Sequence, residues 1–144
     1  MSTTLVLGTD FTEAMRYGQW LLRSHTEVTT IDGGLVGTHL ASALLSARRP
    51  VLLHGLRPWV DAHVEELEVA RRHLPYDVVT IGHDLSWLVP QTTHDAGYSV
   101  HDASRLLAAR LSATSDLLHL LIAGRVVDLT DMPMVPAGSQ HCQT

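Results

Sequence analysis

The alternation of short apolar runs with amphipathic stretches is the feature that most constrains the fold of this chain. The apolar runs are four to eight residues long and are bounded by glycine, proline or polar residues, as buried strands of a parallel sheet are. The sequence therefore predicts five strands, near residues 4–8, 27–31, 50–55, 76–81 and 117–122.

The segments between these runs carry apolar residues at helical spacing. Residues 60–73 show it most clearly, because Val60, Val64 and Leu67 share one face, acids come early and arginines come late. A helix dipole favours that charge order. The alternation predicts an α/β fold: a three-layer sandwich with a mostly parallel five-stranded sheet, helices on both faces and right-handed crossovers. The expected helices span residues 12–24, 38–49, 60–73 and 100–113.

Length and composition set the domain organisation. The chain has 144 residues, of which 45% are hydrophobic and 17% charged, enough for one domain with a substantial core. No internal repeat or linker appears, so residues 1–144 are expected to form a single α/β domain. Residues 83–100 are expected to be a long loop of open role, and residues 125–144 an irregular C-terminal tail, because they contain prolines and lack periodicity.

Charge and hydropathy exclude several function classes. The net charge of -5 and the absence of a Lys/Arg run disfavour nucleic-acid binding. No run approaches the roughly 18 apolar residues that a membrane span needs. Cys142 is the single cysteine, so no intrachain disulfide forms, and the start of the chain lacks a signal peptide. These features favour a cytoplasmic protein, and without a glycine-rich phosphate loop no nucleotide is expected.

The predicted strands end in glycines beside polar residues, notably at Asp32-Gly33-Gly34 and at His54-Gly55. Ligands of open α/β sheets bind outside the carboxyl ends of the strands. Two compatible interpretations of Asp32-Gly33-Gly34 follow. The glycines supply the positive φ angles of a tight turn, or they let a peptide backbone approach the start of the next helix.

The order of these motifs resembles the hydrogenase maturation endopeptidases, which remove the C-terminal tail of nickel-iron hydrogenase large subunits. The matching stretches are LVLG, a Glu-Ala opening the first helix, IDGGLVG, VLLHG, SVHDASRLLAARL and LLIAG, within residues 4–55 and 98–124. The resemblance implies a protease whose partner is a large-subunit precursor. The family carries no classical triad and is guided by the substrate's nickel, so no catalytic residue is assigned.

Carried over by position, the family's metal ligands fall on Glu13, His54 and His101. One carboxylate and two imidazoles suit nickel or zinc. The resemblance also implies that Asp32, Gly33 and Gly34 hold the substrate tail. This chain departs from the family where His54 replaces an aspartate, and an alignment shifted by one residue would place that ligand on Gly55 instead. The family's closing C-terminal helix is also absent.

Those departures keep a second interpretation open, in which the same fold serves as a non-proteolytic binding or assembly module. On that reading Glu13 is an acid favoured by the helix dipole, His54 is a strand histidine with satisfied hydrogen bonds, and His101 begins a helix.

Overall fold

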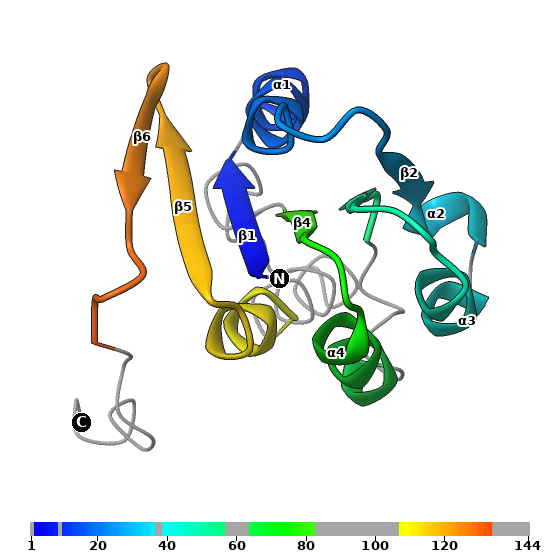
Figure 1. Ribbon diagram of the computed structural model, residues 1–144. Helices are drawn as coiled ribbons and strands as arrows, with labels where there is room; N and C mark the ends of the chain where they lie inside the picture. The colour runs from blue at the N-terminus through cyan, green and yellow to red at the C-terminus, as the bar shows by residue number, and fades with distance from the viewer. Residues whose placement is uncertain (1, 9, 37–38, 57–63, 83–106, 134–144) are drawn as a thin grey trace, which may run out of the picture.

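The structure is a computed structural model that describes residues 2–8, 10–36, 39–56, 64–82 and 107–133. Strands and helices alternate along most of the chain, as the apolar runs predict (Figure 1). In chain order they are β1 (Thr3–Gly8), α1 (Phe11–Leu21), β2 (Thr29–Asp32), α2 (Gly33–Val36), α3 (Leu40–Leu45), β3 (Val51–His54), α4 (Val64–His73), β4 (Val78–Gly82), β5 (Leu117–Ile122) and β6 (Arg125–Asp128). Residues 107–113 form a further helical segment.

The strands form one six-stranded sheet in the order β2-β3-β4-β1-β5-β6, with β2 and β6 at opposite edges (Figure 1). Every described neighbour pair is parallel except β5 and β6. The α/β prediction is confirmed, and the strand count differs by β6, which occupies residues expected to be an irregular tail. Ala123 and Gly124 both have positive φ, 50° and 73°, which suits the two-residue turn of a hairpin. Ala-Gly is a weaker turn signal than Asn-Gly, so the sequence did not reveal this strand.

The helices cover both faces of the sheet, which confirms the three-layer arrangement. Helix α1 packs on one face, and α3, α4 and the 107–113 helix pack on the other (Figure 1). On the α1 side, a Cβ on Gly18 would lie only 2.8 Å from Leu52 Cδ1 and 3.0 Å from Ile81 Cδ1. The glycine therefore lets α1 approach the sheet closely.

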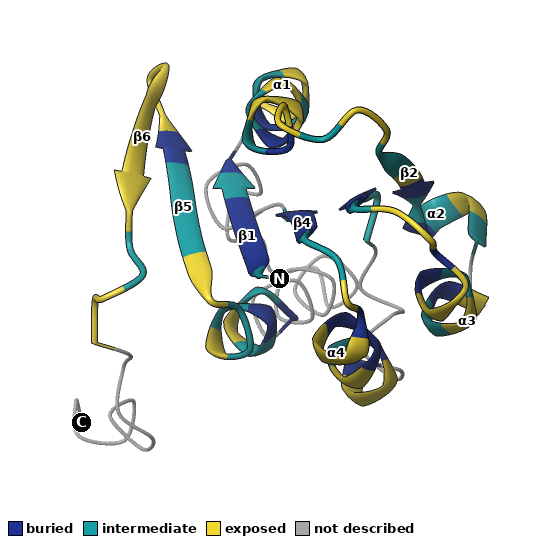
Figure 2. Cartoon of the chain, in the orientation of Figure 1, coloured by how far each residue is buried: buried dark blue, intermediate teal, exposed yellow. Residues whose placement is uncertain are grey.

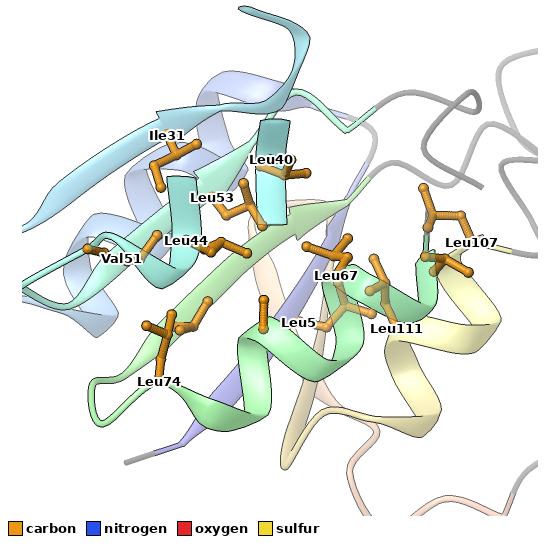
Figure 3. Packing of buried hydrophobic residues seen from close by; sticks show 14 residues of the cluster. Leu5, Ile31, Leu40, Leu44, Val51, Leu53, Leu67, Leu74, Leu107 and Leu111 are labelled. Carbon is orange, nitrogen blue, oxygen red and sulfur yellow. The ribbon is translucent and has the colours of Figure 1, made fainter. Parts of the chain in front are cut away.

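The larger core lies beneath α3 and α4 (Figure 3). Leu5 in β1 is fully buried in this core, and Leu53 in β3 points to the same side of the sheet. Their sequence neighbours Val6 and Leu52 point to the α1 side instead, because successive strand residues alternate between faces. Burying each such leucine stabilises the fold by roughly 1.5–3 kcal/mol. Figure 2 shows the resulting pattern, with a buried central sheet and an exposed β6.

Helix boundaries differ from prediction where capping or turn chemistry decides them. Helix α1 begins at Phe11, because the Asp10 side chain accepts a hydrogen bond from Glu13 N and caps the helix. The helix expected over 38–49 is shorter, Leu40–Leu45, and a separate turn of helix, α2, precedes it. The first residues of the helices expected at 60–73 and 100–113 lie outside the described residues. Within the described part of the chain, no helix is long and apolar enough to cross a membrane.

Candidate functional site at the carboxyl ends of β2 and β3

Asp32 and His54 are the two predicted site residues that the fold brings together. They are register partners in the parallel pair formed by β2 and β3, and each is the last residue of its strand. Both lie on the α1 side of the sheet, because Leu52 packs on that side and Ile31 on the other. A carboxylate and an imidazole therefore lie side by side at the carboxyl ends of the strands, where α/β folds bind ligands.

The Asp32 carboxylate is engaged by its own turn. Its Oδ1 accepts a hydrogen bond of 2.9 Å from Gly34 N, at the start of α2. The same oxygen lies where a Cβ on Gly55 would be, and Gly55 has a φ of +72°. Asp32 thus satisfies an amide at the start of α2 and packs against the chain as it leaves β3.

Gly33 is buried, and the space that a side chain would occupy there is already filled by the end of β3. A Cβ on Gly33 would lie 3.3 Å from His54 O and 3.4 Å from Gly55 O. The close approach is therefore made by the protein's own backbone. Whether a peptide also approaches Gly33 and Gly34 stays a prediction.

The interpretation that Gly33 and Gly34 supply positive φ angles is wrong. Among the described glycines, positive φ occurs at Gly55 and Gly124. The chain passes from β2 directly into α2 at Gly33, so both residues adopt the negative φ of a helix. The left-handed residue of this region is Gly55, on the neighbouring strand.

His54 contacts the first residue of α1. Its ring centroid lies 5.5 Å from that of Phe11, with an angle of 58° between the planes. This contact places the start of α1 beside the end of β3. Glu13 is half-buried in the first turn of α1, where its amide nitrogen lies 3.2 Å from Asp10 Oδ1.

The predicted ligands Glu13 and His54 are linked in the fold through Phe11, which contacts His54 and lies in the same helical turn as Glu13. Glu13 follows Phe11 by two residues, so its side chain leaves α1 about 200° around the axis from the ring that contacts His54. His101 lies outside the described residues. In the described ranges, no three His, Cys, Asp or Glu side chains gather to hold a metal ion. The three-residue metal site stays a prediction.

A groove of about 750 Å³ runs along β2, and sequence reasoning did not find it. Asp32 and His54 line it at the carboxyl end of β2, and Arg48 and Arg49 line it near the amino end. In the sequence these arginines are adjacent and belong to no longer basic run. The other residues that line the groove are Thr29, Thr30, Ile31, Leu35, Val36, Ala43, Ser46 and Ala47.

No family model matches the chain, and no curated protein matches it.

Proposed function

We propose that this protein is a maturation endopeptidase that removes the C-terminal peptide of a nickel-iron hydrogenase large-subunit precursor. The observation that carries the proposal is the groove along β2, which ends at Asp32 and His54. Its volume of about 750 Å³ is within the range of ligand pockets, and it can take a short extended segment. The motif order of the sequence supplies the substrate class.

In this proposal His54 meets the substrate at the end of the groove, and Asp32, Gly33 and Gly34 form the turn that closes it. Glu13 and His101 would complete the set that binds the substrate's nickel, or a zinc ion, and such a metal would polarise the scissile carbonyl. The fit of this set is incomplete in the described residues, because Glu13 and His54 are not part of any group of three potential metal ligands there. No catalytic step is therefore derived through the metal.

A second candidate function is a non-proteolytic binding or assembly module that uses the same groove. The histidine at position 54 favours it, because the proteases that the sequence resembles have an aspartate ligand there and the metal-binding set is then altered. Such a module would hold the precursor without cutting it.

Incubation of the purified protein with a nickel-loaded precursor, read by mass, tests the first candidate. The unaltered protein should release the C-terminal peptide, and His54→Ala should not. His73→Ala is the matched control, since His73 is an exposed histidine at the end of α4 and should leave release intact. An intact precursor that forms a stable complex with the unaltered protein would favour the binding module. No complex and no cleavage would reject both functions.

A further inference from the structure

Among the residues that the structure describes, the strand β2 presents an unpaired edge to the groove. It is the outermost strand on its side of the described sheet and pairs only with β3 there. Thr29 N donates to Pro50 O at 2.8 Å, so Thr29 and, two residues on, Ile31 direct their backbone groups toward β3. The intervening residue, Thr30, directs its N–H and C=O outward, and it is exposed. An open edge of this kind accepts an added strand.

The groove beside this edge is lined between its ends by apolar residues together with Thr29, Thr30 and Ser46, and it is charged at its ends. Val36, Ala43 and Ala47 line it from the helices α2 and α3 and from the residues that follow. A side chain of an added strand can pack against these residues.

The charges at the two ends of the groove have opposite signs. Arg48 and Arg49 lie near the amino end of β2, and Asp32 lies at the carboxyl end. Arg49 already pairs with Glu27 at 2.8 Å. Arg48 is exposed and makes no ion pair in the described part of the chain. Counting only the described residues, the amino end of β2 thus keeps one positive charge that has no ion-pair partner.

We propose that the β2 edge binds an extended peptide antiparallel to β2, with the peptide's C-terminal carboxylate at Arg48 and Arg49. An antiparallel strand places its C-terminus beside the amino end of β2, where the arginines lie. A parallel strand would place the carboxylate beside Asp32, where like charges repel. The charges of the groove therefore select the antiparallel direction.

This inference deepens the proposed function, and it rests on that function only for the identity of the natural peptide. The four residues of β2 span about 13 Å, since a strand rises about 3.3 Å per residue. A bound tail would contribute about four to six residues, and the chain preceding them would reach Asp32 and His54. The edge would thus set which bond of a precursor arrives at His54.

A fluorescent peptide of six alternating threonine and valine residues, with two amino-terminal lysines for solubility, is the probe. It is prepared with a free C-terminal carboxylate and as the C-terminal amide, and binding is measured by anisotropy. We expect the acid to bind about two- to fivefold more tightly than the amide, the range of a solvent-screened ion pair. Arg48→Glu should abolish or reverse this difference. Arg125→Glu, on the opposite edge strand, should leave it intact.

The strand geometry is tested separately. Thr30→Pro removes an outward N–H without breaking a bond to β3, and should abolish binding of both peptides. Val126→Pro on β6 is the matched control, because the hairpin register gives Val126 an outward N–H as well. Should Thr30→Pro fail to fold by circular dichroism, the unaltered protein is titrated with peptides N-methylated at alternate residues. Methylation of one alternate set should abolish binding and methylation of the other should not.

Three results would overturn the inference. The first is equal affinity for the acid and the amide in the unaltered protein, and the second is full binding by folded Thr30→Pro. The third is a dimer of the unaltered protein, seen by native mass spectrometry, that Thr30→Pro makes monomeric, because a second copy would then occupy the edge. Cleavage of the precursor without peptide binding at β2 would reject this inference and leave the proposed function standing. Peptide binding with an uncut precursor would support this inference and reject the endopeptidase.

Discussion

The carboxylate of Asp32, at the end of β2, packs directly against the backbone of Gly55, the residue that follows β3. Asp32 Oδ1 accepts a hydrogen bond of 2.9 Å from Gly34 N. Gly55 has a φ of +72°, and the same oxygen fills the space that a side chain on Gly55 would need. The acid and glycines of the Asp-Gly-Gly motif therefore have a structural role that is complete within the chain. Any ligand role is additional to it.

A Gly55→Ala substitution should destabilise the protein through two separable effects. The left-handed φ costs an alanine about 1–2 kcal/mol, and the overlap of its Cβ with Asp32 adds to this. Gly124→Ala isolates the first effect, because Gly124 has a φ of +73° and nothing within 4 Å of its Cβ position. Urea unfolding should show the larger loss for Gly55→Ala.

The double variant Gly55→Ala, Asp32→Ala completes the comparison. Asp32→Ala alone should cost about 1 kcal/mol, the usual cost of losing a helix-capping side chain. In the double variant the overlap is gone, so the combined loss should be smaller than the sum of the two single losses. Strict additivity would show that the two residues are not coupled.

The strands were predictable because a strand buried on both faces must be almost continuously apolar. The runs near 50–55 and 117–122 coincide with β3 and β5 to within one residue. The strand order was not predictable, since it depends on which strands pair in three dimensions. The edge position of β2, and with it the groove, is a property of that order. The sequence could place Arg48 and Arg49 in a pair but could not place them beside an open strand.

The sequence predicted only those parts of the candidate site that lie at the ends of strands. Parallel strands bring their carboxyl ends to the same end of the sheet, so the proximity of Asp32 and His54 follows from the predicted topology. The packing of Asp32 on Gly55 did not follow, because it depends on a left-handed backbone at a residue that the pattern left ambiguous. Arg71 shows the same limit: it was interpreted as a helix-end arginine favoured by the dipole, yet it is buried in the fold.

Replacing Arg71 with methionine should stabilise the protein. Arg71 is only 2% exposed, and its Nη2 donates to Ser115 Oγ at 2.8 Å. Its Nε and Nη1 have no hydrogen-bond partner among the described residues. Burial lowers the pKa of Arg71 to about 10, against the opposing charges of Glu68 and Asp116. An apolar side chain of similar length avoids this desolvation, which is often worth about 1–4 kcal/mol.

Two further variants identify the cause of that effect. Arg71→Ala should instead lose about 2–4 kcal/mol, because it leaves a cavity where the aliphatic stem packed. Arg72→Met, on the exposed side of α4, should change stability by no more than about 0.5 kcal/mol. A marked loss of stability in Arg71→Met, measured by urea unfolding, would mean that the guanidinium stabilises this helix packing.

Tyr17 should ionise later than an ordinary tyrosine. Its hydroxyl lies 2.8 Å from His119 Nδ1, and burial together with the charge of Asp128 raises its pKa above the usual 10.0. An absorbance titration should show a late phenolate component that disappears in Tyr17→Phe and persists in Tyr76→Phe. Because the folded-state pKa is the higher one, the stability that Tyr17 contributes is fully present below pH 10 and is lost as pH rises through the folded value. Tyr17→Phe should therefore flatten the alkaline loss of stability.

Metal titration provides the last test, because it addresses the predicted ligands directly. If Glu13, His54 and His101 form one site, calorimetry with nickel or zinc should show a single strong binding event. Removal of one direct ligand should weaken it by more than the roughly 10–100-fold that loss of an outer partner causes. His54→Ala, His101→Ala and Glu13→Gln should each do so, whereas His73→Ala, an exposed histidine at the end of α4, should not. Unchanged affinity in His54→Ala alone would show that His54 is not a ligand. The ring of His54 would then have a packing role against Phe11, and the groove along β2 would be the remaining candidate for substrate binding.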